Sequence, residues 1–87
     1  MTDETVTAPA NAQPTIAGLR IGIMDAATLG GVSKARLLLR PPGQDTQVVL
    51  AVGESREVPG HGTVTLVDVD ATDAARHPLV TIRVTTP

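Results

Sequence analysis

The sequence predicts a small all-β domain, either an antiparallel β-sandwich or a partly open barrel of five to six strands. Short runs rich in Val, Ile, Leu and Thr recur along the chain, and clusters of Gly, Pro and Asp separate them. No stretch carries the apolar spacing of an amphipathic helix over about eleven residues. The 87 residues suffice for one hydrophobic core, so we expect one domain.

The first 14 residues differ in composition from the rest of the chain. They contain two acids, two prolines and small polar residues, without an apolar period of either kind. We therefore predict a flexible N-terminal tail over residues 1–14 and a single β domain over residues 15–87. The tail also lacks the basic start and apolar run of a secretory signal, so we expect a cytoplasmic protein.

The first two strands are expected at residues 19–25 and 34–40, where apolar and polar side chains alternate. The segment 26–33 between them contains a Gly-Gly pair and is predicted to be a loop. The outward row of the second strand is charged apart from Leu38, which we expect to be exposed and to cover a neighbour or a partner. The inward positions of the two strands are Leu19, Ile21, Ile23, Ala35, Leu37 and Leu39.

The later strands follow Pro-Gly and Gly-rich turns. A strand at 46–52 is apolar on both faces, which favours a central or covered position in the sheet. A short arm at 55–58 precedes the longest strand, 62–69, whose early half should be half-exposed and whose late half should be buried on both faces. After a wide loop or single helical turn, the last strand runs from 79 to 85 and points Val80, Ile82 and Val84 inward.

The composition excludes several classes of function. The chain has no cysteine, which excludes a disulfide scaffold, a thiolate metal cage and a thiol nucleophile. It has no Phe, Trp or Tyr, so the stacking platforms that bind single-stranded nucleic acid are missing. The net charge of −2 also argues against nucleic acid as a partner, and no apolar run is long enough for a membrane span. We expect no cofactor.

The core must be built from aliphatic side chains alone, which makes a monomer of this size marginal. Small domains with thin cores often bury further surface by associating, so we expect a homo-oligomer. Arg outnumbers Lys, and Lys34 is the single lysine. Ala, Val, Gly, Pro and Thr are frequent. This composition resembles that of proteins from GC-rich bacterial genomes.

Two sets of side chains are candidates for an ion or ligand site. His61 lies between two glycines in a turn and His77 precedes a proline, so both are interpreted as solvated loop side chains. Carboxylates cluster at the end of the long strand, where two would share one face and could hold a hard cation. They lack the glycine and distal glutamate of a calcium loop, and hydrated turn carboxylates are the default interpretation. The cluster comprises Asp68, Asp70 and Asp73.

The most informative feature is the placement of cationic side chains on outward strand positions. If the first, second and last strands share a sheet, its outer face is basic on a net-acidic protein, and we hypothesise that this face meets an acidic partner. Such residues also serve solubility and edge protection, which is the competing interpretation. The predicted partner-binding residues are Arg20, Lys34, Arg36, Leu38, Arg40 and Arg83.

These observations predict a non-enzymatic module that interacts with another protein or with itself, because no nucleophile elbow, cofactor fingerprint or positioned base is present. One alternative is a small-molecule or metal-ion binding protein, with its site near His61 and His77 or at the Asp68–Asp73 cluster. A pocket of several hundred Å³ beside a histidine would favour that alternative. A second alternative is a structural subunit of a larger assembly.

Overall fold

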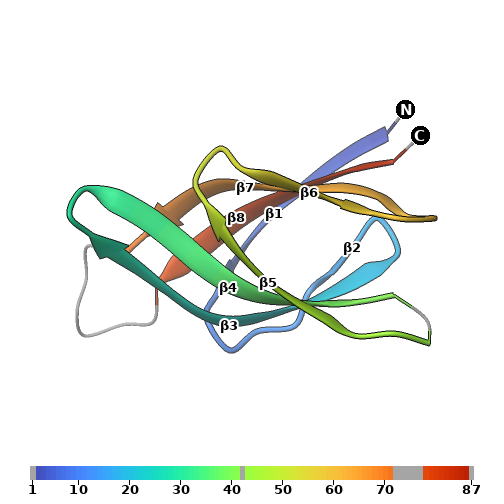
Figure 1. Ribbon diagram of the computed structural model, residues 1–87, viewed down its shortest axis with the longest axis horizontal. Helices are drawn as coiled ribbons and strands as arrows, with labels where there is room; N and C mark the ends of the chain where they lie inside the picture. The colour runs from blue at the N-terminus through green and yellow to red at the C-terminus, as the bar shows by residue number, and fades with distance from the viewer. Residues whose placement is uncertain (1, 42, 72–77, 87) are drawn as a thin grey trace.

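The computed structural model describes residues 2–41, 43–71 and 78–86, and these residues form a sandwich of two antiparallel sheets (Figure 1). Sheet A has the strand order β1-β8-β7-β6, and sheet B has the order β2-β3-β4-β5. The all-β prediction is confirmed and the sandwich is the form adopted, with eight strands in the described residues rather than the predicted five to six. The strands are β1 (Thr2–Pro9), β2 (Thr15–Ile16), β3 (Leu19–Leu29), β4 (Val32–Arg40), β5 (Thr46–Ala51), β6 (Ser55–Val58), β7 (Gly62–Asp70) and β8 (Leu79–Thr86).

The core lies between the inner faces of the two sheets and is entirely aliphatic. Every inward position predicted from the alternation of β3, β4 and β8 is buried, because a strand points successive side chains to opposite faces. No polar or charged residue is buried among the described residues. The largest fully buried side chains are Ile16, Leu19, Ile21, Ile23, Leu37, Leu39, Leu66 and Ile82, together with Val64, Val80 and Val84.

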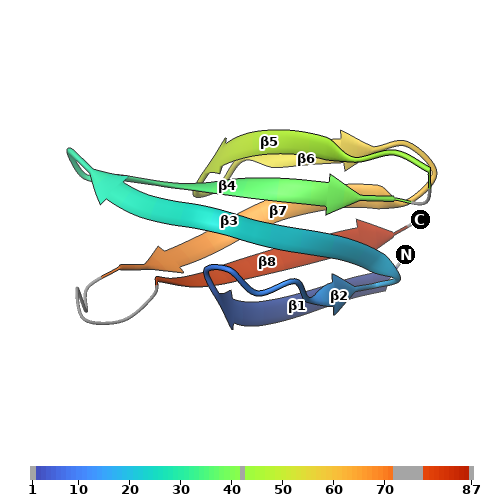
Figure 2. The ribbon, with the colours of Figure 1, turned by 90° about the horizontal axis from the view of Figure 1, so that it is seen from below.

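The N-terminal segment is a strand, which corrects the prediction of a tail. Thr2–Pro9 forms β1 and pairs along its whole length with β8. Val6 and Ala8 are half-buried against the core and stand opposite Ile82 and Val80. These two apolar residues form only a short alternating pattern in the sequence, and they become part of the core through pairing with a strand from the other end of the chain. The pairing places the two chain termini side by side at one end of the sandwich (Figures 1 and 2).

The segment predicted as a loop at 26–33 is also regular. Strand β3 continues to Leu29 and reverses through Gly30 and Gly31 into β4. Both glycines have positive φ, +59° and +80°, as a two-residue hairpin turn with the right twist requires. The hairpin extends beyond the sandwich at the end opposite the termini (Figure 2), and Leu29 at its tip is 78 % exposed.

Two further expectations are corrected by sheet position and by a bulge. Strand β5 is an edge strand of sheet B rather than a central one, and Val49 on its outer side is 58 % exposed. In β7 the register shifts between Leu66 and Asp68, so Val67 is exposed although Val69 is buried. A bulge adds one residue to the strand and interrupts the alternation of inward and outward side chains. The late half of this strand is therefore not buried on both faces.

Candidate partner-binding edge

The predicted basic face is divided between the two sheets. Arg20, Lys34, Arg36 and Arg40 lie on β3 and β4, on the outer side of sheet B. Arg83 lies on β8 in sheet A, where it pairs with Thr5 and Thr65. The first and second predicted strands therefore share a sheet, but the last strand does not, and the expectation of one face with Arg83 is wrong.

Ion pairs neutralise half of the cations on the outer side of sheet B. Arg36 Nη2 lies 2.5 Å from Asp25 Oδ2 across the β3–β4 pair, and Arg40 Nε lies 3.5 Å from Asp45 Oδ1. Arg20 stands opposite Arg40 in the register, so like charges face each other there. The face is basic, but less so than its sequence predicted.

Leu38 is half-buried rather than exposed. It stands opposite Gly22 on β3 and Gln47 on β5. A Cβ atom on Gly22 would lie 3.5 Å from the Leu38 Cβ, so the leucine packs over the glycine. This packing explains the break in the charged row: Leu38 covers a neighbour in its own sheet.

The carboxylate and histidine candidates are only partly described. Asp68 and Asp70 are exposed on β7 and share its outer face, as predicted, whereas Asp73 and His77 lie outside the described residues. Within residues 2–41, 43–71 and 78–86, no group of three His, Asp or Glu side chains is placed to hold a metal ion. His61 lines an open hollow of about 390 Å³ at the β6–β7 turn, together with Glu57 and Thr85.

Three of the four edge strands carry features that oppose pairing with another strand. Strand β2 has only two residues. Strand β6 has four residues, of which two, Arg56 and Glu57, are charged. Strand β1 carries Asp3, Glu4 and Pro9, and the Glu4 carboxylate accepts a hydrogen bond from the Ala17 N–H of the β2–β3 turn. Charges, proline and shortness are the usual protections of an exposed strand edge.

Strand β5 carries none of these protections. Its six residues, Thr46–Ala51, contain no charge and no proline, and its register with β4 has no bulge. Among the described strands it pairs with β4 alone, so its other side is open. The sequence shows the uncharged run, but which side of the run stays open depends on the order of strands in the sheet.

The hydrogen bonding of the neighbouring residues identifies the free backbone groups of β5. The Val52 N–H donates to the Ser33 carbonyl at 3.0 Å, which places residue 52 in a hydrogen-bonded pair with β4. Because such pairs alternate along antiparallel strands, Thr46, Val48 and Leu50 also bond to β4, while Gln47, Val49 and Ala51 point their N–H and C=O groups away from it.

Glu54 occupies one end of this open edge. The Ala51 N–H donates to Glu54 Oε1 at 2.7 Å, and the Ala51 carbonyl accepts from the Glu54 N–H at 2.9 Å. The backbone groups left for a partner on β5 are therefore the N–H and C=O of Gln47 and of Val49.

Comparison with protein-family models, with curated proteins and with solved structures finds no match for this chain. In the part of the chain that the structure describes, no helix is long and apolar enough to cross a membrane.

Proposed function

We propose that the protein is a non-enzymatic interaction module that binds an extended protein segment by adding it as a strand to β5. The open backbone groups of Gln47 and Val49 carry this proposal. Among the edge strands of the described sheets, β5 is the one that is longer than two residues and has no charge, no proline and no bulge. Main-chain hydrogen bonds supply affinity in this mode of recognition, and pockets for alternate side chains supply specificity.

The expected binding strength is modest. Four backbone groups give about 0.5–1.5 kcal/mol net for each hydrogen bond. Val49 adds apolar area, since it is 58 % exposed and lies beside the incoming strand. The bound segment belongs either to another protein or to a second copy of the chain, and a structural subunit of a larger assembly would use the same edge.

The proposal is tested by removing one outward-facing N–H group. Val49→Pro deletes a donor that β4 does not use, so the fold should persist, as proline is tolerated where an edge N–H faces solvent. Val49→Thr is the matched control, since it keeps the N–H and the β-branched shape. The probe is a pool of short neutral peptides that alternate Val and Thr, with Gln at one varied position.

Binding is measured from the backbone amide NMR shifts of Gln47 and Val49 at millimolar peptide. The wild type and Val49→Thr should respond at both amides. In Val49→Pro, where residue 49 has no amide proton, the Gln47 amide should not respond. Sedimentation or light scattering of the protein alone reports pairing between copies. A protein that stays monomeric and shows no shift on β5 with any peptide would refute strand addition.

The hollow beside His61 favours a second candidate function, the binding of a small molecule. Its volume of about 390 Å³ lies within the size range of ligand sites, although it is open to solvent. A screen of small soluble compounds should then shift the resonances of His61 and Thr63, and His61→Ala should abolish those shifts without altering β5.

A further inference from the structure

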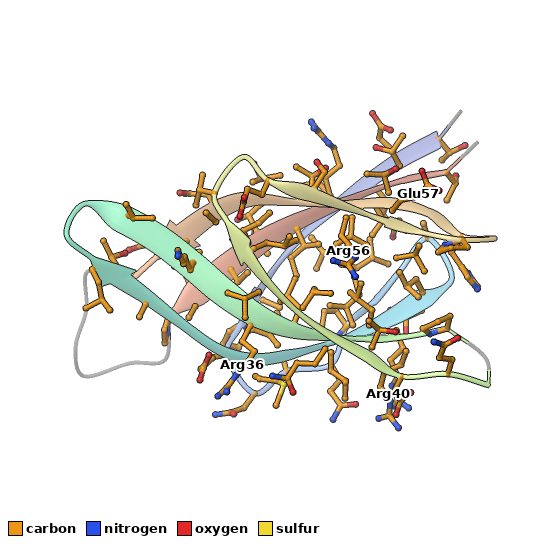
Figure 3. All side chains as sticks on the ribbon, in the orientation of Figure 1. Arg36, Arg40, Arg56 and Glu57 are labelled. Carbon is orange, nitrogen blue, oxygen red and sulfur yellow. The ribbon has the colours of Figure 1, made fainter. Side chains whose placement is uncertain are left out.

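Arg56 is a cation on the inner side of an edge strand. In β6 it stands opposite Val64, which is fully buried, and it shares its side of the strand with the buried Val58. The arginine itself is exposed, because β6 is the last strand of sheet A. In the view of Figure 3, the Arg56 side chain lies between the ribbons of β5 and β6.

The space around Arg56 reaches the first residue of β5. A hollow of about 300 Å³ is lined from the β6 side by Arg56, Glu57, Val58 and Pro59, and from the side of β4 and β5 by Leu39, Pro41, Gln44 and Thr46. Among the described residues no carboxylate forms an ion pair with the Arg56 guanidinium. The hollow therefore combines a cation that has no ion-pair partner in the described part of the chain with a lining that is partly polar and partly apolar, and Glu57 is the carboxylate in that lining.

A strand added to β5 would direct alternate side chains into this hollow. Successive residues of a strand point to opposite faces, so one row of the added strand lies on the same side as Thr46 and Val48. We propose that the segment bound by β5 is acidic, with a carboxylate in that inward row, and that Arg56 pairs with it. This inference rests on the proposed function and names the chemistry of its partner.

Charge complementarity favours such a segment over a second copy of the chain. In a two-fold antiparallel pairing of two β5 strands centred on Val48, the inward row of the incoming strand would be Thr46, Val48 and Leu50. That row holds no carboxylate, so the dimer would cover Arg56 without neutralising it, and removing an unpaired charge from water is costly. On the other side of β5, Lys34 and Arg20 leave the outer face of sheet B basic as well.

The test compares three peptide pools that differ at the varied position, which is Glu, Gln or Lys. The wild type should bind the Glu pool about tenfold more tightly than the Gln pool, the effect of one partly desolvated ion pair. Arg56→Gln should make the Glu and Gln pools equal, and Arg56→Glu should prefer the Lys pool. Arg83→Gln, an exposed outward arginine of sheet A, is the matched control and should behave as the wild type.

Each outcome separates this inference from the function on which it rests. Equal binding of all three pools by the wild type, lost in Val49→Pro, would overturn the role of Arg56 and leave strand addition intact. A mass that doubles with concentration, depends on Val49 and is indifferent to the peptides would identify a second copy as the occupant and overturn the acidic segment. A reversal of preference in Arg56→Glu would establish the ion pair.

Discussion

The two sheets protect their edges differently. In sheet A each edge strand carries a charge on its inner side, Glu4 in β1 and Arg56 in β6, opposite the buried Val84 and Val64. In sheet B the long edge strand β5 places only uncharged side chains on that side. Both inner faces bury the same kind of aliphatic core, so packing does not require the charges. The difference indicates that sheet A is protected from pairing with other strands and that β5 is open to it.

The largest effect on stability is expected where β6 is joined to sheet A. Gly62 has φ +122°, and a Cβ atom there would lie 2.1 Å from the Thr85 carbonyl oxygen of β8. Gly62→Ala should therefore lower the free energy of unfolding by more than about 2 kcal/mol, because backbone must move. Gly60→Ala, with φ +83° and open space, should cost about 1 kcal/mol. Equal losses in urea denaturation would contradict the close approach.

A smaller loss is expected at the other edge of sheet A. Glu4→Ala removes the carboxylate that accepts the Ala17 N–H and should lower the free energy of unfolding by about 1 kcal/mol, less than for a buried charged hydrogen bond because the site is exposed. Asp3→Ala on the outer side of the same strand is the control and should change it by less than about 0.5 kcal/mol. If both variants unfold at the same urea concentration, β1 is not held in place through Glu4.

The ion pair beside β5 should contribute less. Arg36 and Asp25 are 43 % and 60 % exposed at the side chain, so solvent screens their attraction. A double-mutant cycle with Arg36→Ala and Asp25→Ala should give a coupling free energy below about 1 kcal/mol, decreasing with added salt. A larger coupling that salt does not change would mean that the outer face of sheet B depends on this pair for its shape.

The smallest change in stability is expected for Arg56→Leu. The guanidinium is exposed, so the free energy of unfolding should change by less than about 0.5 kcal/mol. Association should nevertheless increase, since the variant removes the inward charge that opposes pairing on this side. Light scattering of concentrated protein would report a higher mean mass than for the wild type. A mass unchanged from that of the wild type would contradict a protective role of the charge.

The sequence predicts which side chains of a strand are buried, because this depends on alternation within the strand. It does not predict features that depend on which strands pair with each other. Ile21, Leu37 and Ile82 are buried as expected, because the two-residue period assigns faces without knowledge of the topology. The strand at Thr2–Pro9 was missed because its short apolar row is completed only by β8, from the opposite end of the chain.

The candidate site was harder to predict for the same reason. The sequence shows the uncharged run of β5, but its two apolar faces predict a covered strand, and only the order of strands shows that it is an edge. Arg56 is not among the predicted partner-binding residues, although its two-residue spacing from the buried Val58 indicates that it points inward. Arg83 was grouped with the cations of sheet B because the sequence does not say which strands share a sheet.

Residue-resolved amide hydrogen exchange of β5, with and without the Glu peptide pool, tests the open edge most directly. In dilute free protein the amides of Val48 and Leu50 should be protected, and those of Gln47 and Val49 should exchange rapidly. The Glu pool should protect Gln47 and Val49. Protection of these two amides in the dilute free protein, or rapid exchange that the peptides leave unchanged, would contradict the assignment of β5 as the binding edge.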